Sequence, residues 1–185
     1  PISPKINRAA SGSKAWKTKI AGYYNDSELS YLYSPCFDLS AMTTPTLSFS
    51  VAMDIEDCGA VLCDAAWMEY SADGITWTKL GAVGQGTNWY NKNYAGNQLW
   101  SRQDYTNWHV ATTALPTTNN SRLRFRFVFN SDTGLNKDGI AVDDIHVYDN
   151  LFGLYEGGTM ATPVTQTINT GTNNWVDFLE GGKLV

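Results

Sequence analysis

The sequence predicts an all-β protein in which two antiparallel sheets pack against each other. Apolar and polar residues alternate with a period of two along several segments, while helical apolar spacing is almost absent. The 185 residues include seven Trp, ten Tyr and seven Phe, which favour the half-buried surface of a sheet. Sixteen Gly supply turns between short strands. Many short strands separated by turns are typical of a β-sandwich.

Strand-like segments occur in the order 29–34, 47–56, 67–71, 76–80, 107–111, 122–129 and 139–148. The clearest is 122–129, where four apolar residues alternate with three arginines. Its apolar face is Leu123, Phe125, Phe127 and Phe129, and its arginine face is Arg122, Arg124 and Arg126. Burying the apolar face contributes about 6–10 kcal/mol. Asp73 and Gly74 lie between two of the segments, and Asp-Gly in that position is a strong hairpin signal.

The chain divides near residue 150. We expect 1–150 to form the β-sandwich domain. Residues 151–185 contain a Thr-rich polar run and then a strand-like segment, which we interpret as a linker followed by a returning strand or by the start of a next β module. The chain starts without Met and ends in this strand-like segment, so we expect an excerpt from a longer exported protein.

Charge narrows the possible partners. The formal net charge is -5 and the pI is about 4.9, which disfavours a nucleic-acid-binding domain. No apolar run approaches the roughly 20 residues of a membrane-spanning helix. Five basic residues precede the first acidic one: Lys5, Arg8, Lys14, Lys17 and Lys19. We interpret them as a segment that pairs with the acidic body, the alternative being an arm for an acidic partner.

Several motifs in fixed order resemble a known family. They are SPCFDLS at 34–40, LSFS at 47–50, YSADGITW at 70–77, RFRF at 124–127 and DGIAVDDI at 138–145. Together they resemble the MAM-like jelly-roll modules of secreted and cell-surface multidomain proteins of Bacteroidetes. The resemblance implies an antiparallel, concanavalin-like jelly roll, an extracellular location and further domains in the same chain. The family's usual opening strand should precede Pro1, so we expect this chain to lack it. The resemblance implies no catalytic activity.

The three cysteines suggest one disulfide. Cys58 and Cys63 are separated by five positions across a Gly-containing turn, and in an oxidising compartment we expect them to be bonded. Cys36 then remains a free thiol, which we expect to be buried as a small hydrophobic residue. With two His and no Cys-x-x-Cys spacing, a zinc site is disfavoured.

Calcium is the metal that the acidic residues favour, since it takes oxygen ligands from loops. By the resemblance, Asp143 and Asp144 form an acidic pair of the kind found near a metal in MAM-like jelly rolls. Asp26 and Glu28, in a nearby turn, are candidates for the other ligands. The alternative is that Asp144 accepts hydrogen bonds from the buried backbone amides of a crossing loop.

Glycan binding is suggested by the stretch 84–108, which is rich in Asn and aromatic residues and has no regular period. The candidate ligand-binding residues are Trp89, Tyr90, Tyr94, Trp100 and Arg102. Flat rings suit the C–H faces of sugars, while polar groups fix the hydroxyls. The alternative is that these rings serve packing.

No catalytic motif is present: we find no His-Glu-x-x-His helix, nucleophile elbow or phosphate-binding Gly loop. The predicted function is therefore a non-catalytic, secreted or cell-surface adhesion module whose partner is a glycan or a neighbouring protein module. The alternatives are a structural spacer or protein–protein interaction module and, more remotely, an accessory domain of a secreted hydrolase.

Overall fold

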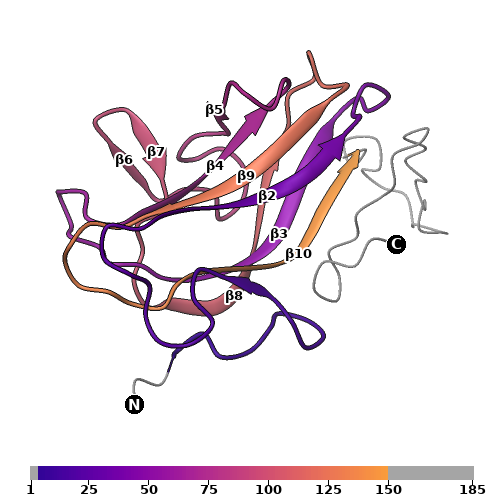
Figure 1. Ribbon diagram of the computed structural model, residues 1–185. Helices are drawn as coiled ribbons and strands as arrows, with labels where there is room; N and C mark the ends of the chain where they lie inside the picture. The colour runs from indigo at the N-terminus through magenta and orange to yellow at the C-terminus, as the bar shows by residue number, and fades with distance from the viewer. Residues whose placement is uncertain (1–3, 150–185) are drawn as a thin grey trace.

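The computed structural model describes residues 4–149, which form ten β-strands (Figure 1). In chain order the strands are β1 (Trp16–Lys17), β2 (Leu29–Phe37), β3 (Pro45–Asp54), β4 (Ala65–Ser71), β5 (Thr78–Lys79), β6 (Lys92–Tyr94), β7 (Asn97–Leu99), β8 (Tyr105–Ala114), β9 (Leu123–Asn130) and β10 (Gly139–Asp149). Within this part of the chain, no helix has the length and apolarity to cross a membrane. The predicted linker and strand at 151–185 lie outside the described residues.

Two four-stranded antiparallel sheets pack against each other, which confirms the predicted β-sandwich (Figure 1). The first sheet has the strand order β1-β10-β3-β8, and the second has the order β2-β9-β4-β5. Strands β6 and β7 form a separate hairpin. Trp100, directly after this hairpin, forms an antiparallel bridge with Ala66 of β4. The hairpin is thereby attached to the edge of the second sheet.

The β6–β7 hairpin was not predicted, because its sequence lacks an apolar alternation. Its two strands are joined by a turn in which Ala95 has φ 49° and Gly96 has φ 85°. Positive φ at both central residues matches the twist of a two-residue hairpin turn. The backbone conformation of this turn, rather than a buried face, therefore defines the hairpin.

The core lies between the sheets and is built from alternate residues of the long strands. On β9, the side chains of Leu123, Phe125, Phe127 and Phe129 are all buried, as predicted. Phe127 meets Phe49 of β3 edge to face, with ring centroids 4.9 Å apart. Edge-to-face pairs of this kind add to the burial of apolar area. The predicted apolar face of 122–129 is thus the centre of the core.

Asp73 stabilises the turn between β4 and β5. Its Oδ1 accepts hydrogen bonds from the backbone N–H groups of Ile75 and Thr76, both at 2.7 Å, and from the hydroxyl of Ser71 at 2.9 Å. These donors hold the pKa of the Asp73 carboxyl well below its usual range. Gly74 has φ 76°, a conformation that disfavours side chains. The predicted Asp-Gly turn signal is confirmed.

The N-terminal segment packs against the outer face of the first sheet. Ile6 is buried against Ala52 and Ala141, and its N–H donates to Asp138 Oδ2 at 2.6 Å. Lys17 also reaches Asp138, at 3.5 Å. Lys5 forms ion pairs with Asp54, at 3.3 Å, and with Asp104. For Lys5 and Lys17, the predicted pairing with the acidic body is confirmed.

We predict that Asp73→Asn lowers the melting temperature at neutral pH, by an amount that depends on pH. An aspartate with a depressed folded-state pKa contributes stability above its unfolded pKa of about 3.9 and loses it as the pH falls through the folded value. The difference in melting temperature between wild type and variant should therefore be constant from about pH 7 to 5 and should shrink below about pH 4. Circular-dichroism melts at several pH values measure it, and a pH-independent difference would contradict the assignment.

Candidate functional site

The outer face of the second sheet carries a row of side chains that crosses all four strands. The strand register places Tyr33 opposite Arg126, Arg126 opposite Glu69, and Glu69 opposite Lys79. Successive residues of a strand point to opposite sides of a sheet. The four side chains therefore project outward, on the side away from the core phenylalanines.

Four aromatic side chains gather on this same face. Tyr31 and Tyr33 come from β2 and are 41% and 51% exposed, whereas Trp67 of β4 and Trp77, just before β5, are partly buried. Beneath them, Val128 pairs with both Tyr31 and Trp67 and is buried. We call this surface the aromatic–arginine face. Its members are Tyr31, Tyr33, Trp67, Glu69, Trp77, Lys79 and Arg126.

Arg126 holds the rings together. Its guanidinium carbon lies 4.2 Å from the ring centroid of Trp77, 4.5 Å from that of Tyr31 and 5.8 Å from that of Tyr33. Tyr33 and Trp77 also meet edge to face, with centroids 5.6 Å apart. A cation over an aromatic ring is attracted by the ring's quadrupole. One guanidinium thus contacts two rings of β2 and a third ring from the turn before β5.

Glu69 fixes Arg126 in turn. Its Oε2 accepts from Arg126 Nε at 2.6 Å and lies 2.5 Å from Nη2, while Oε1 accepts from Trp67 Nε1 at 2.7 Å. Burial alone would lower the pKa of Arg126. The hydrogen bond and the negative charge of Glu69 outweigh this effect, so the pKa is raised and the guanidinium stays charged. Lys79 lies 4.6 Å above the ring of Trp67. The face is therefore a pre-organised surface, which lowers the entropic cost of binding a ligand.

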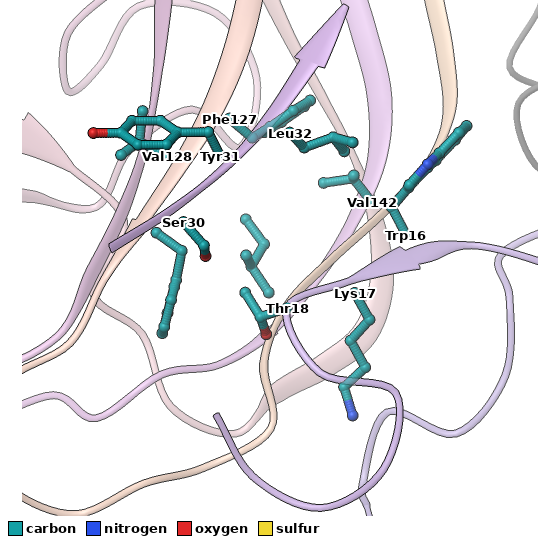
Figure 2. Close-up of a pocket in the computed structure, with 11 residues that line it drawn as sticks. Trp16, Lys17, Thr18, Ser30, Tyr31, Leu32, Phe127, Val128 and Val142 are labelled. Atoms are coloured by element: carbon teal, nitrogen blue, oxygen red, sulfur yellow. The ribbon is translucent and has the colours of Figure 1, made fainter. Parts of the chain in front are cut away.

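An apolar pocket of about 200 Å³ opens between the two sheets, beside β1 and β2 (Figure 2). Trp16, Leu32 and Val142 line it, and in Figure 2 the ring of Tyr31 extends from β2 on the side away from Trp16. The pocket provides apolar contacts and few polar groups that would orient a ligand. The aromatic–arginine face provides both, so we identify the face as the candidate site.

Three of the predicted glycan-binding residues are in the core instead. Trp89, Tyr90 and Trp100 are only 4%, 3% and 1% exposed, so their rings do not form the surface that the sequence suggested. Trp100 packs against the other two with centroids 5.1 and 4.6 Å apart. Both indole N–H groups donate to backbone carbonyls. These three rings therefore pack in the core, which was the alternative interpretation of the sequence.

The other two predicted glycan-binding residues do not join the aromatic–arginine face. Tyr94 lies at the turn of the β6–β7 hairpin and is 37% exposed. Arg102 stacks over Tyr105, with its guanidinium carbon 3.9 Å from the ring centroid. Tyr105 stacks in turn on His109, with ring centroids 3.8 Å apart, and both rings belong to β8 of the first sheet.

The predicted calcium ligands have structural roles in separate places. Asp143 is fully buried, and its Oδ2 accepts from the N–H groups of Ala10 and Ser11 at 3.0 and 3.2 Å. The alternative assigned this role to Asp144, but the residue that accepts from the amides of the crossing segment is Asp143. Asp144 accepts instead from the hydroxyls of Ser11 and Ser50. The acidic pair thus fastens the N-terminal segment to the first sheet.

Asp26 and Glu28 also have protein partners. Asp26 accepts from the side-chain amide of Asn136 at 2.6 Å. Glu28 accepts from the N–H of Asn25 at 3.0 Å and from the hydroxyl of Ser30 at 2.8 Å. Within residues 4–149, neither these two residues nor the Asp143–Asp144 pair belongs to a group of three close metal-ligating side chains. The ligand set predicted from the sequence is therefore not brought together.

A different acidic group forms at one end of the sandwich. Glu56 follows β3, Asp64 precedes β4 and Asp132 follows β9, and one oxygen from each lies within 4.8 Å of the others. We call them the carboxylate cluster. Asp64 is 1% exposed, and burial raises the pKa of its carboxyl, with the charges of Asp132 and Asp26 acting in the same direction. Both oxygens of Asp64 accept hydrogen bonds, Oδ2 from the hydroxyl of Tyr24 and Oδ1 from the N–H of Asp132.

Two details of the carboxylate cluster fit a cation. Glu56 Oε2 is buried and has no hydrogen-bond partner among the described residues. A Cβ at Gly134 would lie 2.8 Å from an oxygen of Asp132 and 3.1 Å from Oε2 of Glu56, so the loop closely approaches both carboxylates. A buried oxygen without a partner is costly, and a metal ion would satisfy it. Calcium, which takes six to eight oxygen ligands, matches this donor chemistry.

The predicted disulfide is present between Cys58 and Cys63, in the loop that connects Glu56 to Asp64. Lys92 Nζ adds a second tie to this loop, 2.7 Å from Asp57 Oδ1. Cys36 is a free thiol and is partly rather than fully buried, since it lies near the end of the edge strand β2.

Comparison with known proteins adds no relative: no family model matches the chain, and no curated protein matches it either.

The burial of Trp100 generates a stability prediction. Trp100→Ala should lower the free energy of unfolding by about 3–5 kcal/mol, because it empties a core position. Tyr33→Ala, on the exposed face, should cost about 1 kcal/mol or less. Urea denaturation followed by fluorescence compares the two variants. Equal stability of both would contradict the division between core rings and surface rings.

Proposed function

We propose that this domain is a non-catalytic binding module of an extracellular adhesion protein and that it binds glycans through the aromatic–arginine face. The observation that carries the proposal is the set of four aromatic side chains on one open sheet face, three of which are held around Arg126. The outer face of the other sheet is covered in part by the N-terminal segment. A ligand therefore has a prepared surface on the second sheet.

The chemistry of the face suits sugars. The faces of aromatic rings carry negative charge density and attract the weakly positive C–H groups of a pyranose ring. The hydroxyl of Tyr33 and the ammonium of Lys79 lie in the same row and can bond to sugar hydroxyls. Because the sheet face is extended, it suits a chain of sugar units.

The finer fold that we propose is a MAM-like jelly roll. In support, β1, β3, β8 and β10 share one sheet while β2, β4, β5 and β9 share the other, with the first strand beside the last. Consecutive long strands thus alternate between sheets, as in the two Greek keys of a jelly roll. The Cys58–Cys63 disulfide supports export to an oxidising, extracellular location.

Calcium is the proposed cofactor, with Glu56, Asp64 and Asp132 as its ligands. The supporting observations are the buried, unpartnered oxygen of Glu56 and the buried charge of Asp64. A bound calcium ion would neutralise these carboxylates. The three residues would then hold together the loops that follow β3 and β9 and precede β4. Its role would be structural, because these loops make no contribution to the aromatic–arginine face.

We predict that Tyr33→Ala and Trp77→Ala each weaken glycan binding about tenfold or more, which corresponds to about 1.4 kcal/mol or more. Tyr94→Ala is the matched control, since it removes an exposed aromatic ring at the β6–β7 hairpin. A glycan array identifies the bound sugars, and calorimetry with the best of them measures each variant. An array without binding by a folded domain would favour the spacer or protein–protein alternative.

Calcium binding should appear as added stability. At a free concentration about 100 times its Kd, calcium should raise the free energy of unfolding by about 2.7 kcal/mol, and Glu56→Gln should abolish most of this gain. Glu28→Gln is the control, because the Glu28 carboxylate lies outside the carboxylate cluster and accepts from Asn25 and Ser30. Urea denaturation in calcium and in chelator measures both variants. If Glu28→Gln instead abolished the stabilisation by calcium, the calcium site would be assigned to the turn that contains Asp26 and Glu28.

A further inference from the structure

The charge on the aromatic–arginine face differs from that of the whole protein. The chain has a net charge of -5. Yet two more arginines lie on the same side of β9 as Arg126. Arg124 is on the strand, and Arg122 comes just before it. Elsewhere, Lys5, Lys17 and Lys92 form ion pairs with acidic residues of the sandwich. On the face and its continuation along β9, the cationic side chains therefore outnumber the single carboxylate of Glu69.

Arg122 and Arg124 are the basic side chains available to a ligand. Both are exposed, and neither forms an ion pair with any residue of 4–149. Arg126, in contrast, is occupied by Glu69 and by the rings. The two exposed arginines and Arg126 alternate along β9, so neighbouring members are about 6.8 Å apart along the strand. They form a line of positive charge that begins at the rings.

The acidic side chains near these arginines in the sheet are occupied. Ser71, which pairs with Arg124, is followed by Asp73, whose carboxylate accepts backbone hydrogen bonds within its own turn. Asp38, at the end of β2, accepts from the N–H and hydroxyl of Ser40. Hydrogen bonds from Ser40 hold the pKa of the Asp38 carboxyl below its usual range. Neither acid makes an ion pair with the arginine line.

We propose that the glycan bound here is anionic, with carboxylate or sulfate groups on its sugars. The inference rests on the proposed function. Sugar rings lie against Tyr33 and Trp77, and the acidic groups pair with Arg124 and Arg122. A guanidinium presents a planar fork of N–H donors that matches a carboxylate or sulfate. Because the arginines are exposed, salt weakens this pairing.

The test uses ligands that differ only in charge. Polygalacturonate is compared with its methyl ester, and dextran sulfate with dextran, by affinity electrophoresis and calorimetry of the full chain at two salt concentrations. We expect at least tenfold tighter binding of an acidic member than of its neutral counterpart, and weaker binding at the higher salt concentration. The double variant Arg122→Gln/Arg124→Gln should remove most of this preference. Arg8→Gln/Lys14→Gln, which removes two charges elsewhere, should leave it unchanged.

The outcomes separate the anionic ligand from glycan binding itself. Salt-independent binding of a neutral glycan that requires Tyr33 would overturn the anionic assignment and leave the proposed function standing. Equally tight binding to inorganic polyphosphate, insensitive to Tyr33→Ala, would mean plain ion exchange and would also overturn it. Preference for the acidic polymers that survives in Arg122→Gln/Arg124→Gln would contradict the role of the arginines. Failure of Tyr33→Ala to affect any array-positive glycan would reject the proposed function.

Discussion

Strand β9 is hydrogen-bonded to β2 on one side and to β4 on the other, and both the core and the candidate site depend on this central position. Its apolar residues point inward and meet β3 across the sandwich, as Phe127 does with Phe49. Its arginines point outward between the side chains of two neighbouring strands. A register shift of one residue would exchange the two faces and bury the arginines, so the position of the strand is strongly specified.

The two sheets use their outer faces differently. On the first sheet, buried carboxylates bind the amides of the N-terminal segment, and Ile6 fills the apolar surface. On the second, the arginine at the centre is neutralised by Glu69 and surrounded by rings. The first arrangement attaches the chain to itself. The second leaves rings and charges open to a partner, and this difference is the physical basis for placing the ligand there.

Much of the fold follows from local patterns, because period-two alternation and an Asp-Gly turn determine strands and a hairpin without knowledge of their neighbours. The candidate site depends on which strands are neighbours in the sheet, and local sequence patterns do not show this. The arginines of 122–129 were visible in the sequence, but their rings come from β2 and from the β4–β5 region. Likewise, Glu56 and Asp132 are 76 positions apart and meet only because β3 and β9 end at the same side of the sandwich.

Local patterns also did not show that some of the predicted glycan-binding residues would be buried. Trp89 and Trp100 lie in a Gly- and Asn-rich stretch whose composition indicates an exposed loop. The structure buries them because this stretch bridges to β8 of the first sheet through Thr87 and to β4 of the second through Trp100. Composition indicates a loop here, but it does not show which side chains of the loop turn inward.

The most direct test of the central claim is a titration of the ¹⁵N-labelled protein with oligogalacturonide, followed through the indole N–H signals of its tryptophans. Binding at the aromatic–arginine face should shift the signals of Trp67 and Trp77 and leave those of Trp89 and Trp100, which are buried, unchanged. Shifts confined to Trp16 or Trp108, which lie at other surfaces, would contradict the account.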